Sequence, residues 1–262
     1  MPANPTGSEL TVTVVDAAIR EYWDAEALRA AYAKAVVAKK ERIVFEMSDG
    51  KKFGDTYHFI ELAALSTNAV GADGAVANQS VTHTARDVAI ATWREVTVTI
   101  PDRAAIQSSI EYGNIFASEA GKAIAVYQDD LVFDDHGSYT GANAIGSTTA
   151  PGALSDDLLL EAVVVEDNIP VEDENRSWYF APIAKSQLLK LDKFTHVSAT
   201  GEKKGPQLTN LFGEVYGAPV FTSSRVVSTG TPAVRKNLYL HRQAVAMVME
   251  RNLNVEPLAR GP

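Results

Sequence analysis

The side chains of this sequence that could do chemistry are histidines, carboxylates and hydroxyls, because cysteine is absent. One local group resembles acid–base machinery, and it consists of His136 with Asp134, Asp135 and Ser138. The same residue types are common in ordinary turns. No two of the five histidines are four positions apart, and no nucleophile-elbow or phosphate-loop motif occurs. We therefore predict no enzyme, no metal site and no cofactor, and keep as an alternative a soluble hydrolase that uses His136 and nearby carboxylates.

Acidic residues are concentrated in one part of the chain. Residues 123–175 contain no Lys or Arg but twelve acidic residues: Asp129, Asp130, Asp134, Asp135, Asp156, Asp157, Glu161, Glu166, Asp167, Glu172, Asp173 and Glu174. The first four do not follow the spacing of a calcium loop, which disfavours a metal site. The segment is expected to be a solvated face or a surface that contacts a neighbouring subunit.

The overall composition excludes several classes of protein. The chain has 24 Lys and Arg against 33 Asp and Glu, which gives a formal net charge of −9 and no broad basic patch for nucleic acid. No apolar run reaches the 18 residues of a membrane span, and no basic segment followed by an apolar one begins the chain. We expect a protein that is soluble and resides in the cytoplasm or in a virion.

The first hundred residues predict an arm, a helix and an extended hairpin. Residues 1–15 are expected to form the arm, and Asp24 can cap a helix that runs to about Lys40. Its expected apolar stripe is Leu28, Ala31, Tyr32, Ala35 and Val36. Residues 55–65 and 86–100 are expected to be extended, with Val96 to Ile100 the most strand-like part.

The segment between the two extended stretches is unusual for a compact domain. Residues 66–85 are rich in Ala, Asn, Gly and Thr, and a loop of this length is uncommon unless it has a function. A lone two-stranded hairpin is also only marginally stable in water. We therefore expect the hairpin to project and to rest on another copy of the same protein.

A long helix is predicted over residues 103–133. Its apolar positions recur at steps of three and four: Ile106, Ile110, Gly113, Ala117, Ala120, Ile124, Tyr127 and Leu131. At about 1.5 Å per residue such a helix would be roughly 46 Å long. Small residues in its middle, including Ala117 and Gly121, would let a sheet or another helix approach closely. A coiled coil is the rival interpretation of the same stripe.

The remaining sequence predicts short helices and strands, and hence an α+β protein. Ser155 or Asp156 can cap a short helix, and residues 178–183 form an apolar strand that a proline ends. A short helix over 184–191 follows, and strands are expected within 212–221, 237–240 and 244–249. The aromatic residues Trp93, Trp178, Tyr179 and Phe180 are expected in the core.

Four local motifs, in this order of elements, resemble the major capsid proteins of tailed bacteriophages, whose fold is named after phage Hong Kong 97. Phe53-Gly54-Asp55-Thr56 resembles the start of the hairpin called the E-loop. Trp178 to Pro182 with Ser186 to Leu189 resembles a strand, proline and short helix of these families. Gly213 to Ser223 and Leu238 to Ala246 resemble two stretches that follow. The resemblance covers roughly residues 43–250.

The resemblance implies a domain organisation and a set of intersubunit contacts. Residues 1–42 would be the N-terminal arm and helix, 43–102 the E-loop hairpin region, 103–175 and 243–262 the peripheral (P) domain with its spine helix, and 176–242 the axial (A) domain. The E-loop, the arm and the acidic segment would contact neighbouring subunits. The residues expected there are Thr56, Tyr57, Phe59, Leu62, Asn68, Asp73, Asn78, Arg86, Trp93, Arg94, Asp134 and Asp135.

By the same resemblance, the chain would assemble through hexamers and pentamers into an icosahedral virion shell that encloses double-stranded DNA, without binding it sequence-specifically. Its implied partners are itself, a portal protein and a separate scaffolding or decoration protein, with assembly in the host cytoplasm and no membrane. Residues 66–85 contain no lysine, so no covalent crosslink is expected there. An encapsulin-type nanocompartment shell is the alternative with the same fold.

Overall fold

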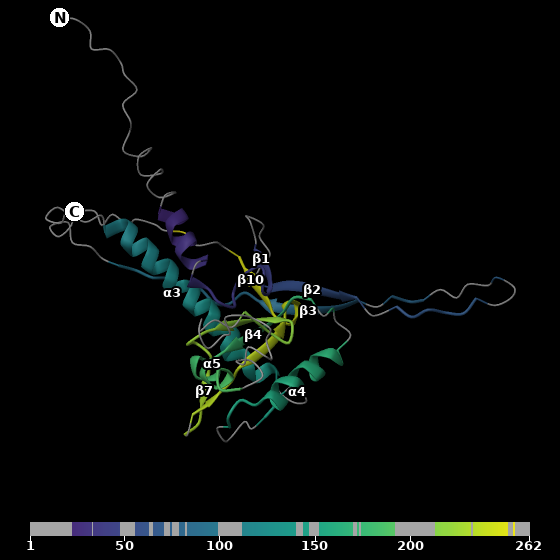
Figure 1. Cartoon of the computed structure of the whole chain (residues 1–262). Helices are drawn as coiled ribbons and strands as arrows, with labels where there is room; N and C mark the ends of the chain where they lie inside the picture. The colour runs from purple at the N-terminus through teal and green to yellow at the C-terminus, as the bar shows by residue number, and fades with distance from the viewer. Residues whose placement is uncertain are drawn as a thin grey trace, which may run out of the picture. The chain divides into compact units, whose positions relative to one another are not determined.

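The computed structural model describes fifteen stretches of the chain, in which helices and strands are mixed (Figure 1). They are residues 23–32, 34–47, 56–62, 65–70, 74, 79–81, 83–98, 112–139, 144–146, 152–169, 172, 174–191, 213–231, 233–250 and 254. The chain divides into two compact units. One comprises Met1–Phe45, Glu95–Met247 and Leu253–Pro262, and the other comprises Glu46–Arg94 and Val248–Asn252. The predicted arm over residues 1–15 lies outside the described residues.

The elements confirm the α+β class. The strands are β1 (Val44–Met47), β2 (Thr56–Leu62), β3 (His83–Ala89), β4 (Arg176–Phe180), β5 (Glu214–Val215), β6 (Ala218–Thr222), β7 (Ser228–Thr229), β8 (Val234–Arg235), β9 (Leu238–His241) and β10 (Ala246–Met249). The helices that follow the hairpin are α3 (Tyr112–Asp134), α4 (Asp156–Asp167), α5 (Pro182–Leu188) and the short 3-10 helices η1 (Asp135–Tyr139) and η2 (Arg242–Ala244). An N-terminal helix spans residues 23–32.

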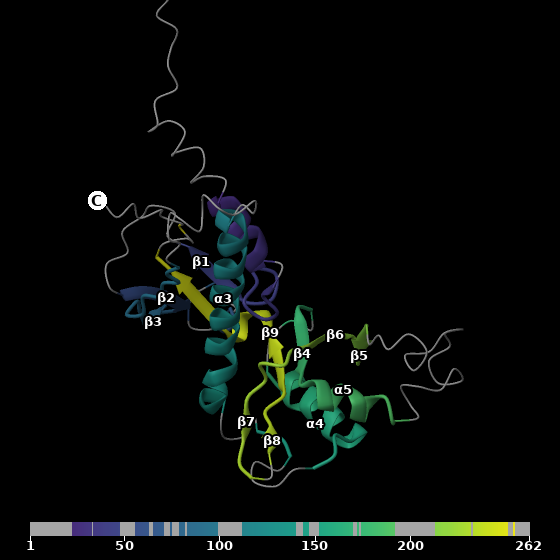
Figure 2. The same cartoon turned by 90° about the vertical axis from the view of Figure 1, so that its left-hand side faces the viewer.

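A four-stranded sheet in the order β5-β6-β4-β9 forms the centre of the first unit (Figure 2). Strand β4 is parallel to β6, with Trp178 opposite Val220, and antiparallel to β9, with Trp178 opposite Tyr239. All five β4 residues are buried, and Pro182 begins α5 two residues after the strand ends. The predicted buried strand ended by a proline is therefore confirmed. So is the Ser155 cap of α4, whose hydroxyl oxygen accepts the Leu158 N–H at 3.4 Å.

Strand β4 separates two hydrophobic clusters, because successive side chains of a strand point to opposite faces. Tyr179 packs with a cluster that includes Val37, Ile43, Val132 and Phe133. Trp178 and Phe180 pack with one that includes Leu159, Leu188 and Val215. The Trp178 ring stacks on Tyr239 with 3.9 Å between centroids. The core placement of these three β4 aromatics is confirmed, whereas the core placement of Trp93 is wrong, since 72% of its surface is exposed.

Burial of Tyr179 gives the fold an alkaline limit that can be measured. Burial raises the pKa of Tyr179 to about 12, from an ordinary value of 10.0. The neutral phenol is favoured in the folded chain, so stability is complete below pH 10 and falls as the pH rises toward 12. The shift corresponds to roughly 3 kcal/mol. We expect urea unfolding at increasing pH to show this loss in the wild type and a smaller loss in Tyr179→Phe, in which the pKa of Tyr239 is still raised by burial. An equal loss in both proteins would contradict the assignment.

The N-terminal helix ends earlier than predicted. Regular helix stops at residue 32, residue 34 is still helical, and residues 36–43 form bends and turns. The cause is Asp129 of α3, a buried carboxylate that accepts the backbone N–H groups of Val36 at 2.7 Å and of Val37 and Ala38 at 2.9 Å each. Backbone N–H groups that donate to this side chain do not donate to the carbonyl groups of the preceding helical turn, so the α-helix does not continue through residues 36–38. The extension of the helix to Lys40 is therefore wrong.

The buried face of the N-terminal helix also differs from the predicted stripe. Leu28 and Tyr32 are 36% and 55% exposed, while Ala27 and Ala30 are buried. Figures 1 and 2 both show this helix beside one end of α3. A Cβ atom at Gly121 of α3 would lie 2.1 Å from the Ala27 carbonyl oxygen. Close approach of the two backbones selects alanine on this face instead of the larger side chains.

Helix α3 confirms the predicted long helix where it is described. It ends at Asp134, one residue beyond the prediction, and the expected start at residue 103 lies outside the described residues. Its buried line runs through Ala117, Gly121, Ala125 and Asp129, so the predicted small-sided middle is confirmed. The predicted stripe is wrong at its C-terminal end, because Leu131 is 44% exposed while Val132 and Phe133 are buried.

The second unit contains the predicted hairpin. Strands β2 and β3 are antiparallel, with Thr56 opposite Ala89 and Leu62 opposite His83. The described residues between them, 65–70, 74 and 79–81, have no regular structure and are exposed. Residues 90–98 are not a strand, so the strand-like reading of 96–98 is wrong. A strand needs a hydrogen-bonded neighbour, and the described strands pair elsewhere.

Candidate assembly surface

The residues expected at intersubunit contacts lie on two separate parts of the chain. Within the hairpin unit, Thr56, Tyr57, Phe59 and Leu62 lie in β2, Arg86 in β3, Asn68 between the strands, and Trp93 and Arg94 after β3. Asp134 and Asp135 are exposed at the junction of α3 and η1, in the other unit. Asp73 and Asn78 lie outside the described residues. The contact role of all twelve residues stays a prediction.

The two faces of the hairpin carry different side chains. On one face Tyr57 and Phe59 meet edge to face, with their ring centroids 4.7 Å apart. On the other, His58 Nδ1 lies 2.5 Å from Asp87 Oδ1 of the opposite strand, and Ile60 is 73% exposed. The His58–Asp87 pair is itself well exposed, so it contributes little to the stability of the hairpin. Within the described residues, the side chain of Ile60 therefore lies largely in water on the His58 face.

Exposed apolar residues recur within the hairpin unit, in strand β2, in the residues between the strands and after β3. They are Ile60, Leu65, Val70, Val81 and Trp93, each at least 47% exposed. Single exposed apolar residues are ordinary, but a succession of this kind in and beside a two-stranded hairpin marks an interaction surface. The contact residues predicted from the sequence include Trp93 but not Ile60. The strand period could have found Ile60, because it falls on the face opposite Tyr57 and Phe59.

Four carboxylates of the acidic segment bind groups elsewhere in the same chain, which neither sequence interpretation foresaw. Asp129 anchors residues 36–38, and Asp130 accepts a hydrogen bond of 2.6 Å from Arg225 Nε. This bond with Asp130 raises the pKa of Arg225. Asp156 accepts the Tyr216 hydroxyl, and Asp167 pairs with the buried guanidinium of Arg176. In the described part of the chain, no three His, Asp or Glu side chains are placed to hold a metal ion.

The His136 group does not have the geometry of a nucleophile and its base. His136 Nδ1 lies 3.1 Å from the Phe133 carbonyl oxygen of the preceding turn. The Ser138 hydroxyl donates to Asp135. A catalytic hydroxyl needs a base as its hydrogen-bond acceptor, and here a neighbouring carboxylate takes that place in a short 3-10 turn. The structure therefore gives the hydrolase alternative no support.

The order of elements is a helix, a hairpin, a long helix and a mixed sheet with two short helices, which is the order expected of the Hong Kong 97-like capsid fold. Solved structures of phages confirm the fold. A chain from Mycobacterium phage Che8 matches with 18% identity and a TM-score of 0.55, over 74% of this chain and 70% of that one. A chain from the capsid of cyanophage P-SCSP1u matches with 14% identity and a TM-score of 0.59, over 83% and 76%. A chain from the mature capsid of bacteriophage PhiM1 matches with 11% identity and a TM-score of 0.56, over 82% and 75%.

The chain thus has the Hong Kong 97-like fold of phage major capsid proteins. No protein-family model and no curated protein matches its sequence. Among the described helices, none combines the length and the hydropathy that a membrane crossing requires.

Proposed function

We propose that this chain is a structural major capsid protein. Its copies self-assemble through hexamers and pentamers into an icosahedral head that encloses phage double-stranded DNA. The observation that carries the proposal is the capsid fold combined with an apolar hairpin surface that the described chain leaves uncovered. A shell protein needs such a surface, because each subunit must bury part of itself against its neighbours. The protein then acts through contact geometry and needs no catalytic group.

The hairpin is the element that we assign to the neighbour contact. In the proposed shell, the E-loop of one subunit covers the P-domain of the next, with the contacts made by the twelve residues named above and by Ile60. Arg86 and Arg94 on the hairpin side, and Asp134 and Asp135 at the end of α3, offer opposite charges for such a contact. The domain bounds proposed are 1–42, 43–102, 103–175 with 243–262, and 176–242.

The partners follow from the same proposal. They are further copies of the chain, a portal protein, and a separate scaffolding or decoration protein. The head resides in the virion, is assembled in the host cytoplasm and encloses DNA without reading its sequence. The structures that share the fold come from phages, which favours a phage head over an encapsulin-type compartment. The contents of purified particles distinguish the two, since a head holds DNA and a compartment holds a cargo enzyme.

Trp93→Ala is expected to impair assembly while leaving the subunit folded. Trp93 is 72% exposed, so its loss removes little packing within the chain, but a large aromatic at the centre of an interface often costs 2 kcal/mol or more. We expect light scattering to show an assembly threshold raised at least tenfold. Circular dichroism and the thermal midpoint of the unassembled subunit should be unchanged.

The matched control is Val164→Ala, which shortens another exposed apolar residue, 57% exposed and located on α4. We expect it to assemble as the wild type does. Equal assembly by the Trp93 and Val164 variants would remove Trp93 from the contact surface.

A further inference from the structure

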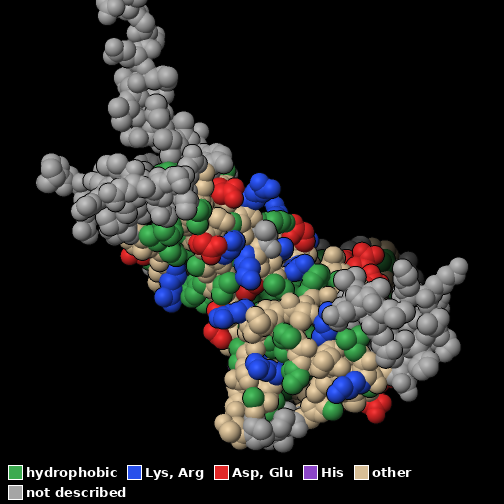
Figure 3. All heavy atoms as spheres, turned by 60° about the vertical axis from the view of Figure 1, so that its left-hand side comes forward, with side chains coloured by type: hydrophobic (Ala, Val, Ile, Leu, Met, Phe, Trp, Pro, Cys, Tyr) green, Lys and Arg blue, Asp and Glu red, His purple; other side chains and the backbone are tan. Residues whose placement is uncertain are grey.

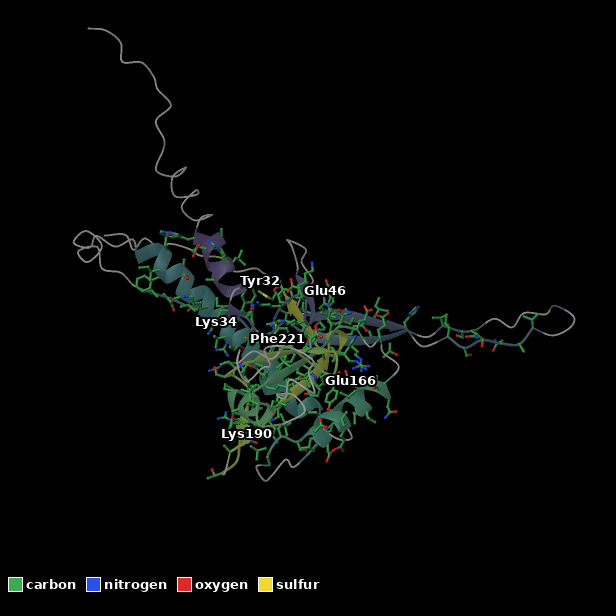
Figure 4. All side chains as sticks on the ribbon, viewed as in Figure 1. Tyr32, Lys34, Glu46, Glu166, Lys190 and Phe221 are labelled. Carbon is green, nitrogen blue, oxygen red and sulfur yellow. The ribbon has the colours of Figure 1, made fainter. Side chains whose placement is uncertain are left out.

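A shallow groove runs between the N-terminal helix and α3, within the first unit. Its volume is about 470 Å³, and it is lined by Glu26, Arg29, Ala30, Lys34, Ser118 and Lys122. The two helices approach each other closely at Gly121 and Ala27, which are the sequence neighbours of the lining residues Lys122 and Glu26. Figure 4 shows Lys34 beside α3, and Figure 3 shows Lys and Arg side chains interspersed with Asp and Glu on the face it presents.

The charge of the groove contrasts with the acidic chain as a whole. Three cations, Arg29, Lys34 and Lys122, face one carboxylate, Glu26, among the lining residues. Lys122 also contacts Glu119, with Nζ 2.7 Å from Oε1, but the two side chains are 45% and 63% exposed and such a pair contributes little free energy. Arg29 and Lys34 form no ion pair within the described residues. By comparison, Arg176 and Arg225 are held by Asp167 and Asp130.

We propose that this groove is the surface of the subunit that contacts the phosphate backbone of the enclosed DNA. The proposal rests on the proposed function and deepens it, since it names the face that meets the polyanion. Lys and Arg flanking an open channel bind phosphates through charge alone and read no bases. With only three cations on a chain of net charge −9, the contact is weak and sensitive to salt. Weak contact suits a shell that must hold its DNA and also release it.

The test compares two doubly substituted proteins with the same change of charge. Lys34→Glu with Lys122→Glu reverses the charge of the groove. Lys185→Glu with Lys190→Glu reverses a lysine of α5 and one that follows it, and neither of these lines the groove. Binding of a short labelled DNA duplex is measured by fluorescence anisotropy over a range of low salt concentrations. Circular dichroism confirms that each variant is folded, and Lys34→Gln with Lys122→Gln is a milder version of the groove change.

The slope of log affinity against log salt is the decisive readout. Each phosphate contact contributes about 0.9 to the slope, so three contacts predict a wild-type slope of roughly −2.7. The groove variant should bind at least tenfold more weakly, with a slope reduced by about 2. The α5 variant should keep the wild-type slope.

Three results would overturn the groove assignment. They are no binding by the wild type at low salt, equal slopes for the two charge-reversed variants, and displacement of the DNA by inorganic phosphate beyond the effect of chloride at matched ionic strength. The last result would make the groove a small-anion site. Failure of the wild type to form shells in electron micrographs would overturn the proposed function instead. The salt dependence of DNA binding would still show whether the groove contacts phosphates.

Discussion

Replacement of Asp129 by alanine is expected to destabilise the subunit by roughly 4 kcal/mol, because three backbone N–H groups lose their acceptor in a largely buried site. Asp129 is 3% exposed, so water cannot take its place without opening the packing between residues 36–38 and α3. A loss of this size would lower the thermal midpoint by roughly 10 °C. Differential scanning calorimetry on the unassembled subunit measures it directly.

The neighbouring carboxylate supplies the control for this substitution. Asp130 pairs with Arg225 at a partly exposed site, and Asp130→Ala should cost no more than about 1 kcal/mol. Asp129→Asn should destabilise the subunit less than Asp129→Ala and more than Asp130→Ala. The amide oxygen of asparagine can still accept a hydrogen bond, but its NH₂ group faces backbone donors. If Asp129→Ala and Asp130→Ala unfold at the same temperature, the anchoring role of Asp129 is wrong.

Gly121→Ala is expected to destabilise the subunit even though alanine is the better helix former. The propensity gain is at most about 1 kcal/mol. The added Cβ would lie 2.1 Å from the Ala27 carbonyl oxygen and 3.0 Å from the Ala27 Cα, which are backbone atoms that no rotamer change can move. The two helices must separate, and overpacking of this kind costs about 1–3 kcal/mol. We expect a net loss of roughly 2 kcal/mol, measured by urea unfolding.

Gly137→Ala is the matched control, because it lies after α3 in η1 and a Cβ there meets no atom within 4 Å. It should change the free energy of unfolding by less than about 1 kcal/mol. A stabilised Gly121→Ala variant would show that the contact between the N-terminal helix and α3 is looser than described.

The elements that the sequence predicts well are those with local signals. Ser155 caps α4 through a hydroxyl three residues from its partner, and Pro182 ends one element and begins the next. The β4 aromatics form a continuous apolar run, which is typical of a strand buried on both faces. Each of these features depends on a few neighbouring residues, so the sequence alone contains the information.

The features that the sequence did not predict depend on partners far along the chain. Asp129 lies more than 90 positions from the amides it anchors, and Asp130 lies 95 positions from Arg225. The N-terminal helix buries its alanines because Gly121 of α3 leaves room for a close approach of the two backbones. The spacing of apolar residues within the N-terminal helix contains no information about that contact. Trp93 is apolar, like core residues, and only the fold places it in solvent. The proposed contact surface depends on a second subunit, which a single chain cannot specify.

Negative-stain electron microscopy of the purified protein, with light scattering on the same sample, shows whether the chain assembles into a shell. We expect closed shells, or rings of five and six subunits, that form above a threshold concentration. A monodisperse monomer would contradict this expectation, provided that it stays monomeric at high concentration, with crowding agents and with lysate that contains a scaffolding protein.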